Sequence, residues 1–185
     1  MAEDDLYHRD FYRWTREQAA RLRALAQREA PADGPADGAG HGAAEGDVQP
    51  DWAAIDAAYL AEEVAQAGRS ELNRVAAQLT NTLVYLLEAA WLSDAHPSRR
   101  WRGEAKSTAR EAARAFTDGM RPHLDMREIW ADALDETNAR LRDTGEPLLP
   151  DGVSCPLSLD DILARRLDAD AAVARLRTAL RGEEG

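Results

Sequence analysis

The sequence predicts an all-α fold, a single-domain helical bundle of four main helices followed by short C-terminal helices. Apolar residues recur every three or four positions through most of the chain, which is the period of an α-helix. No segment shows the alternation typical of a β-strand. The apolar residues are largely alanine and only 6% of residues are aromatic, which favours helices around a thin core. The length of 185 residues is that of one domain.

The first predicted helix covers about residues 4–29. Asp4 and Asp5 stand near its start, where carboxylates oppose the helix dipole. Its predicted core stripe consists of Leu6, Tyr7, Phe11, Trp14, Gln18, Leu22 and Leu25. The next segment, residues 31–49, repeats Pro-Ala-Asp-Gly and then alternates glycine with other residues. It has too little apolar surface to fold and predicts a flexible linker.

The second predicted helix begins after Pro50, with Asp51 as its cap, and runs to about Ala95 before Pro97 stops it. Its apolar stripe consists of Leu60, Val64, Leu72, Val75, Leu79, Leu83 and Leu86. Gly68 lies in the middle of this stripe. Because a glycine inside a helix costs about 1 kcal/mol relative to alanine, its place on the packing face predicts that another backbone comes close there. A kink at residues 67–69 is the alternative.

Two further helices and a C-terminal part complete the predicted bundle. The third helix covers about residues 98–119 and the fourth about residues 123–143, closed by Gly145 and Pro147. After a proline-rich connection, Ser158 and Asp161 form a capping pair for a short helix that reaches about Leu167. We therefore expect a helical domain over residues 1–167 and, over residues 168–185, a helical extension with a charged tail.

Glu62 and Glu63 are adjacent carboxylates, a pattern that can indicate acid and base chemistry. Neighbouring residues on a helix point about 100° apart, so the two carboxylates lie on opposite flanks of the apolar stripe. Glu62 shares its flank with Arg69, whereas Glu63 shares the other with Ser70 and Arg74. Ion pairs and hydrogen bonds at the rim of the helix are the predicted role of these residues.

Four blocks of residues carry a family resemblance. They are Tyr7, Asp10, Phe11, Trp14, Gln18, Ala19 and Leu22; Leu60-Ala-Glu-Glu-Val with Gly68-Arg-Ser-Glu; Ser98-Arg-Arg-Trp101; and Cys155-Pro-Leu-Ser-Leu. In order and spacing the chain resembles, over roughly residues 6–167, the bacterial family named domain of unknown function twenty-nine. The resemblance implies a small helical protein with no established activity. It marks as family residues without an assigned role Asp10, Trp14, Glu62, Glu63, Gly68, Arg69, Ser70, Trp101, Cys155 and Pro156.

The chain departs from the family pattern at one informative place. Relatives tend to carry a His-Leu-Leu-Lys block where this chain has Tyr85 and Glu88. Histidine chemistry shared with the family is therefore not expected here.

No catalytic or metal-binding motif is complete in the sequence. The histidines His8, His41, His96 and His123 are scattered, and none lies in an HExxH or ExxH arrangement. Cys155 precedes a predicted helix start, where a thiol pKa can fall, but proline follows it and a small buried residue is the favoured role. We expect no cofactor and no metal.

Two opposite charge patterns follow the third and fourth predicted helices. Arg102, Lys106, Arg110 and Arg114 form a basic strip at four-residue steps, and Asp125, Glu128, Asp132 and Asp135 form an acidic stripe. Each is most simply a solvated face. The basic strip could instead contact phosphate or an acidic partner, and the two patterns could also meet across a dimer or a helix pair.

Composition and motifs together favour a small cytoplasmic protein that acts by binding another protein, with self-association as a homodimer included. Its net charge of -11 opposes binding to nucleic acids and to anionic membranes. The single cysteine fits the cytoplasm, and no apolar run is long enough to span a membrane. The alternatives are a nucleic-acid-associated protein that uses the basic strip, and an enzyme with a composite site near Glu62 and Glu63. We favour a protein without catalysis.

Overall fold

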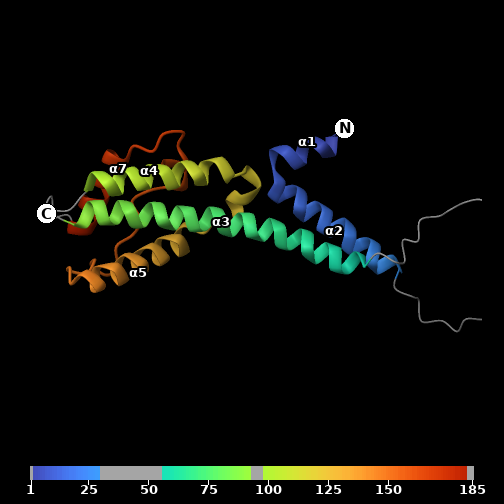
Figure 1. Ribbon diagram of the computed structural model, residues 1–185, viewed down its shortest axis with the longest axis horizontal. Coiled ribbons are helices and arrows are strands. Elements are labelled where there is room, and N and C mark those ends of the chain that lie inside the picture. Colours follow the sequence, from blue (N-terminus) through green and yellow to red (C-terminus); the bar gives the residue numbers. More distant parts are fainter. Residues whose placement is uncertain (1, 30–55, 93–97, 183–185) are drawn as a thin grey trace, which may run out of the picture. The chain divides into compact units, whose positions relative to one another are not determined.

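The computed structural model describes residues 2–29, 56–92 and 98–182. Every regular element in these ranges is a helix, which confirms the predicted all-α fold (Figure 1). The predicted linker over residues 31–49 and the predicted cap Asp51 lie outside the described residues. Contacts divide the chain into two compact units, with the boundary between Arg69 and Ser70. The domain boundary near residue 167 stays a prediction.

The first unit contains α1 (Ala2–Arg9), α2 (Phe11–Glu29) and the first part of α3 (Ala57–Trp91). The prediction of one helix over residues 4–29 was wrong, because the chain breaks between α1 and α2. At the break, Asp10 Oδ1 accepts a hydrogen bond of 3.0 Å from the backbone N–H of Arg13. This contact is typical of a residue that caps a new helix, and it accounts for the start of α2.

The buried side of α2 differs from the predicted stripe. Its buried residues are Tyr12, Thr15 and Ala19, whereas Tyr7 and Leu25 are exposed. On α3 the first unit buries Ala57, Ala61 and Gly68, while Leu60 is 40% exposed. Mainly small residues thus line the contact in this unit, and the large apolar residues chosen from periodicity lie at its edge or outside.

The second unit has its core along the rest of α3. Val75, Leu79, Leu83 and Leu86 are completely buried, as the stripe predicted. The predicted end near Ala95 was wrong, because α3 ends at Trp91. Arg177 binds this end of the helix. Its guanidinium donates to the carbonyl oxygens of Ala89 and Ala90 at 3.3 and 3.2 Å, which satisfies carbonyls at the helix terminus.

The two helices that follow lie on either side of α3 in Figure 1. α4 (Ser98–Ala115) buries Ala105, Ala109 and Ala112 and is followed by the 3₁₀ helix η2 (Asp118–His123), so the third predicted helix ends four residues early. α5 (Met126–Thr144) starts at the cap Asp125 rather than at residue 123, and ends at Gly145 with a φ of 71°. Periodicity predicts a stripe of Met126, Ile129, Trp130, Ala133, Leu134, Thr137 and Leu141 here; all are buried except Met126 and Leu134, which are half-buried.

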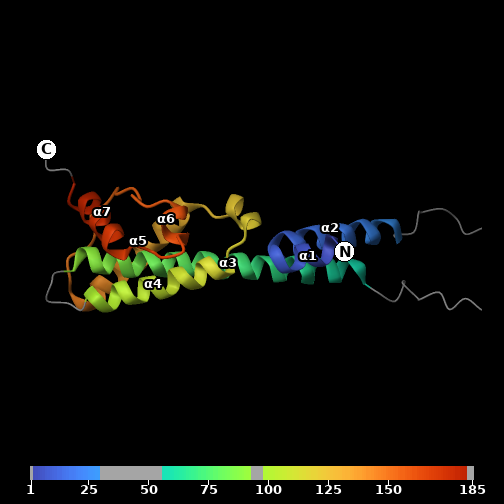
Figure 2. The ribbon, with the colours of Figure 1, turned by 90° about the horizontal axis from the view of Figure 1, so that it is seen from above.

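The C-terminal part consists of α6 (Leu159–Leu163) and α7 (Ala169–Arg181), both of which contact α4 (Figure 2). The capping pair Ser158 and Asp161 is confirmed as a reciprocal capping box. The helix it starts ends at Leu163 rather than near Leu167. Asp168 then caps α7, whose residues Val173, Leu176 and Leu180 are buried. Residues beyond 167 therefore contribute to the core of the second unit.

Candidate functional site

Gly68 lies where α3 meets α2 in the first unit. A Cβ atom added to Gly68 would come within 2.1 Å of Thr15 Oγ1, far inside van der Waals contact, and within 3.1 Å of Thr15 Cβ, which is a tight contact. Thr15 is completely buried, and its hydroxyl donates a 2.7 Å hydrogen bond to the carbonyl of Tyr12. The close approach predicted at Gly68 is found, with a side chain rather than the backbone of the neighbouring helix. α3 stays helical through residues 67–69, so the helix does not break there.

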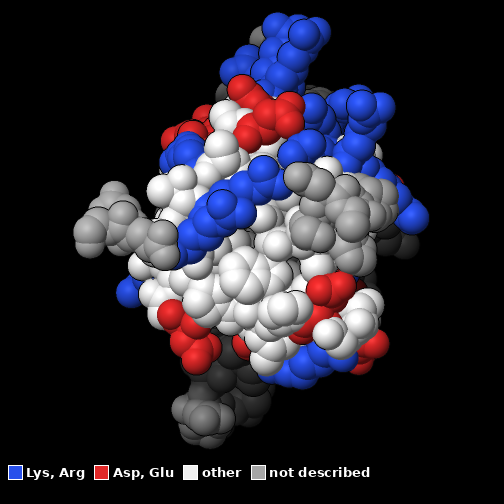
Figure 3. Space-filling model, turned by 90° about the vertical axis from the view of Figure 1, so that its left-hand side faces the viewer, with Lys and Arg blue, Asp and Glu red and all other residues white. Residues whose placement is uncertain are grey.

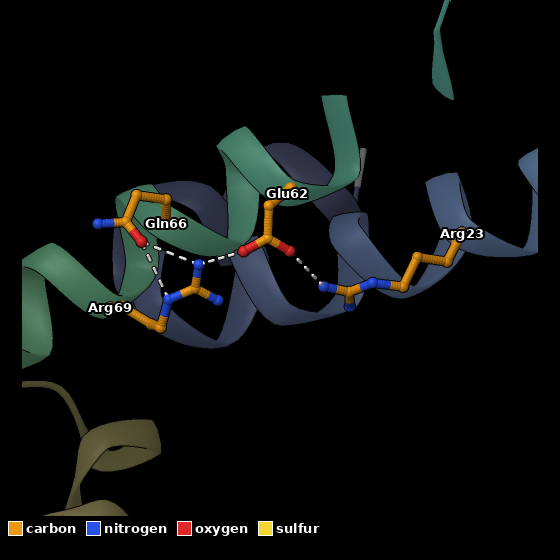
Figure 4. Close-up of polar contacts among 4 residues, drawn as sticks. All are labelled: Arg23, Glu62, Gln66 and Arg69. Carbon is orange, nitrogen blue, oxygen red and sulfur yellow. Dashed lines mark hydrogen bonds and ion pairs between the residues drawn. The ribbon is translucent and has the colours of Figure 1, made fainter. Parts of the chain in front are cut away.

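Glu62 and Arg69 form an ion pair on one flank of α3, as their spacing predicted (Figure 4). Arg69 also donates to Gln66 Oε1 from Nε at 3.1 Å and from Nη2 at 2.8 Å. From α2, Arg23 Nη2 approaches the other carboxylate oxygen of Glu62 at 3.4 Å. The hydrogen bond from Arg69 and its positive charge lower the pKa of Glu62, with a smaller contribution from Arg23. These contacts join α2 to α3 at the surface.

Replacing Glu62 by Gln is expected to lower the urea midpoint of unfolding at pH 7, because both ion pairs are lost. The pKa of Glu62 is lowered from 4.5 in the folded protein, so its stabilising effect is present above pH 4.5 and is lost as the pH falls through the folded pKa. The difference between wild type and Glu62→Gln should therefore shrink in acid. Urea unfolding followed by circular dichroism measures it, with Glu63→Gln as the neighbouring control. Equal effects of the two substitutions would contradict this assignment.

Glu63, Ser70 and Arg74 do not form the convergent site that the enzyme hypothesis needs. Glu63 and Ser70 are exposed, and Arg74 forms an ion pair with Glu71. Arg74 lines a hollow with Glu111 and Arg114 of α4, not with the other two residues. Among the described residues, no group of three histidine, cysteine, aspartate or glutamate side chains is placed to hold a metal ion.

Asp10 and Trp14 have identifiable roles at the start of α2. Asp10 caps this helix, as described above. Trp14 stacks on Phe11 at 5.8 Å between ring centroids and meets the edge of Tyr7 at 4.9 Å. Tyr7 also contacts Phe11 at 5.4 Å. This aromatic cluster joins α1 to α2 across the break, so both family residues shape the N-terminal helices.

Cys155 and Pro156 belong to the extended segment that leads into α6. The thiol of Cys155 donates to the carbonyl of Leu157 at 3.3 Å, and burial raises its pKa. A raised pKa disfavours the thiolate, which is the nucleophilic form. Arg175 of α7 donates to the carbonyl of Pro156 and forms an ion pair with Asp161 at 3.1 Å. These contacts tie the segment to α7, a role in structure that needs no reactive thiol.

The basic strip on α4 is not uniform. Arg102 is partly buried and lies 3.3 Å from Asp170 of α7, close to the half-buried family residue Trp101 in sequence. Lys106, Arg110 and Arg114 are exposed, and none of them has an ion-pair partner in the part of the chain that the structure describes. In the basic strip, Arg102 therefore has an ion-pair partner, whereas Lys106, Arg110 and Arg114 are exposed and have none among the described residues.

A groove of about 520 Å³ runs between α3 and α5 in the second unit. Its apolar lining consists of Leu72, Ala76, Ala77, Leu124 and Ile129. On the α5 side it is lined by the carboxylates Asp125, Glu128, Asp132 and Glu136, with His123 of η2 beside them, and on the α3 side by the neutral side chains Asn73, Thr80 and Asn81. Asp125, Glu128 and Asp132 of the predicted acidic stripe thus line the groove. The fourth carboxylate in its lining is Glu136 rather than the predicted Asp135.

Glu88 of α3 is a buried carboxylate that sequence reasoning did not identify as unusual. It is 7% exposed, and its Oε2 atom has no hydrogen-bond partner in the described structure. Its Oε1 atom lies 3.5 Å from Arg140 Nη1 of α5, and the Arg140 guanidinium also lies 5.6 Å from the centre of the Tyr85 ring. The two residues that depart from the family pattern therefore share one partner. Burial raises the pKa of Glu88, although the charge of Arg140 opposes this.

A smaller hollow of about 390 Å³ lies where α3 ends, and includes Trp91, Leu92, Pro147 and Leu180 with Arg177 and Arg181. Figure 3 views this end of the second unit and shows uncharged side chains crossed by basic ones. Trp91 Nε1 donates to the carbonyl of Pro147 at 2.7 Å, and Arg177 is bound to the end of α3. The Trp91 and Arg177 side chains therefore already form hydrogen bonds that stabilise the fold.

The comparisons with known proteins agree with this structure. The family model described as Domain of unknown function DUF29 matches residues 6–167, which confirms the resemblance read from the sequence. The crystal structure of an alpha-helical protein of unknown function from Rhodospirillum rubrum is similar, with 30% sequence identity and a TM-score of 0.71. The similarity covers 92% of this chain and 96% of that one. No curated protein matches the chain. None of the described helices has both the length and the apolar character to cross a membrane.

Proposed function

This chain belongs to the family Domain of unknown function DUF29, and from that premise we propose that it is a cytoplasmic protein-interaction module without catalysis. Its docking site is the groove between α3 and α5, and its partner is a helix with basic side chains along one edge. The observation that carries the proposal is the groove itself, which combines an apolar floor with carboxylates on one side only.

The floor of the groove suits a helix. Ala76 and Ala77 are small, so a neighbouring backbone can come close to α3, and the half-buried Leu72 adds apolar surface beside the largely buried Leu124 and Ile129. Amphipathic helices bind to proteins in grooves of this kind by placing their apolar face on the floor. Packed helices are separated by about 8–10 Å, which small residues at the contact allow.

The two edges of the groove differ in charge, which gives a bound helix a preferred orientation. Glu128, Asp132 and Glu136 follow one another at four-residue steps on α5, whereas the α3 edge carries neutral amide and hydroxyl groups. Residues at this spacing lie on the same side of a helix. A partner with Lys or Arg at matching steps pairs with the α5 edge, and like charges there are rejected.

The proposal is tested with two synthetic helical peptides that share an apolar face and carry either lysine or glutamate at four-residue steps. Fluorescence anisotropy should show that wild-type protein binds the lysine peptide and that salt weakens binding. Glu128→Lys with Asp132→Lys should reduce this affinity at least tenfold and produce binding of the glutamate peptide. Asp143→Lys with Asp151→Lys, two exposed positions outside the groove, makes the same change in net charge and should leave the preference for lysine unchanged.

The control pair separates the groove from the general acidity of the protein. If both pairs of substitutions weakened binding of the lysine peptide equally, the attraction would come from net charge and the proposal would be wrong. Failure of wild type to bind the lysine peptide at low salt would also contradict it.

A further inference from the structure

We propose that the helix bound in this groove is α4 of a second copy of the same chain, held by Lys106, Arg110 and Arg114. This inference rests on the proposed function and identifies the partner of the same site. It makes the protein self-associating through a basic strip on one copy and an acidic groove edge on the other.

The basic strip is available for such a contact. Lys106, Arg110 and Arg114 are exposed on the side of α4 away from its buried alanines. Among the described residues none of the three has an ion-pair partner, unlike Arg102, which is held by Asp170. Glu111, an acidic residue of the same helix, is directed to α3, where its carboxylate accepts a 3.0 Å hydrogen bond from Gln78. The strip itself is basic, and Glu111 borders the same hollow as its last member, Arg114.

The strip and the groove edge match in spacing and length. Lys106, Arg110 and Arg114 occur at four-residue steps, as do Glu128, Asp132 and Glu136. In both sets the first and last residues are eight positions apart, or about 12 Å at the rise of an α-helix. Three basic side chains on one helix can therefore meet three carboxylates on another without a change in register. Glu136 is shared with Arg140, which lies 2.6 Å away in the same copy.

The apolar side of α4, with Ala105, Ala109 and Ala112, is buried within its own copy, so the outer side of this helix meets the groove through Gly103 and the stems of its basic side chains. Gly103 lies on the same side as Lys106, and a Cβ added there would meet no atom within 4 Å, so this part of the helix surface is low and open. The long aliphatic stems of lysine and arginine can cover the apolar floor while their charged ends reach the carboxylates.

The contact has to come from another molecule. α4 and α5 lie along different sides of the last part of α3 in Figure 1, and the groove is formed between α3 and α5. The α3 surface that faces α4 is occupied by contacts of its own, such as the 2.8 Å hydrogen bond between Thr82 and Thr108. Within one copy the strip consequently faces away from the groove.

Charge reversal on each side, with light scattering as the readout, tests this pairing. At low salt the wild-type protein should have a mass above that of one chain, and salt should return it to the monomer. Lys106→Glu with Arg110→Glu removes the strip, and Glu128→Lys with Asp132→Lys removes the groove edge. Each variant alone should be monomeric, with at least a tenfold loss in association constant. An equimolar mixture of the two should associate again, because each supplies the side that the other has lost.

Two controls keep the outcome clear. Arg165→Glu with Arg166→Glu, at exposed positions outside the strip, makes the same change in charge and should leave self-association intact. Circular dichroism verifies that the variants fold, and recovery in the mixture shows that both remain competent to bind.

The possible failures distinguish this inference from the proposed function. A wild-type protein that is monomeric at low salt but binds the lysine peptide would overturn the second-copy assignment and leave the proposed function in place. Absence of both self-association and peptide binding would contradict both. If the protein stayed monomeric and bound single-stranded RNA in a manner lost with Lys106→Glu and Arg110→Glu, the strip would serve nucleic acid, and the inference would be wrong.

Discussion

Replacing Arg140 by Met is expected to lower the free energy of unfolding by about 2 kcal/mol. Removing one partner of a fully buried ion pair costs about 3–5 kcal/mol, because the remaining charge is left in an apolar environment. Here Glu88 is 7% exposed, but the side chain of Arg140 is 38% exposed, so water reduces the loss. Arg140 also lies over the Tyr85 ring, and Met keeps much of the contact made by its aliphatic stem. Urea unfolding at pH 7 measures the change.

Glu88→Gln is the partner substitution for this experiment. It removes the buried charge and keeps an oxygen near Arg140, so the single variant should be at least as stable as wild type at pH 7. The double variant should lose less stability than Arg140→Met alone. If the loss were the same with Gln at position 88, the buried charge would not be its cause.

The pH dependence of these variants follows from the raised pKa of Glu88. Burial raises it above 4.5, so the folded protein takes up a proton more readily than the unfolded chain. The contribution of Glu88 to stability therefore becomes more favourable as the pH falls through the folded pKa, and the change is complete below 4.5. The loss caused by Arg140→Met should accordingly be smaller in acid than at pH 7.

Gly68→Ala is expected to destabilise the protein, because forcing an extra methyl group into a packed contact usually costs about 1–3 kcal/mol. The added Cβ would lie 2.1 Å from Thr15 Oγ1, on a side chain that is completely buried and cannot move aside freely. This loss outweighs the gain of about 1 kcal/mol that alanine normally brings to a helix interior. Thermal unfolding followed by circular dichroism measures the balance.

The same substitution at Gly103 provides the matched control. A Cβ there would meet no atom within 4 Å, so Gly103→Ala should stabilise by up to about 1 kcal/mol through helix propensity alone. Thr15→Ala should recover part of the stability lost in Gly68→Ala, since the remaining Cβ contact is 3.1 Å. Stabilisation by Gly68→Ala would show that α2 and α3 are not in close contact at this point.

Helical periodicity predicted the fold best where one helix has a wide apolar stripe. Val75, Leu79, Leu83 and Leu86 are buried as predicted, because neighbours cover that face of α3 in the second unit. The same rule misplaced Leu60 and Leu25, which are exposed. In the first unit the glycine at position 68 lets two helices approach closely, and close helices bury small residues such as Thr15 and Ala19 instead of the larger ones beside them.

The candidate site was predictable only in part, since it depends on contacts between helices. Spacing along one helix gave the Glu62–Arg69 pair and most of the acidic stripe, but nothing local indicates that Arg23, 39 residues before Glu62, reaches the same carboxylate. The acidic stripe was expected to face solvent because periodicity describes a single helix. Its role as the edge of a groove requires α3 to lie beside α5, which only the folded structure shows.

Methyl NMR of the protein with and without the lysine peptide tests the central claim, that the groove between α3 and α5 is the docking site. The methyl signals of Leu72, Leu124 and Ile129, which line the groove, should shift on addition of the peptide, whereas those of Leu163 and Leu167 should stay unchanged. Glu128→Lys with Asp132→Lys should abolish the shifts. Shifts confined to residues outside the groove, or the same shifts in this variant, would contradict the account.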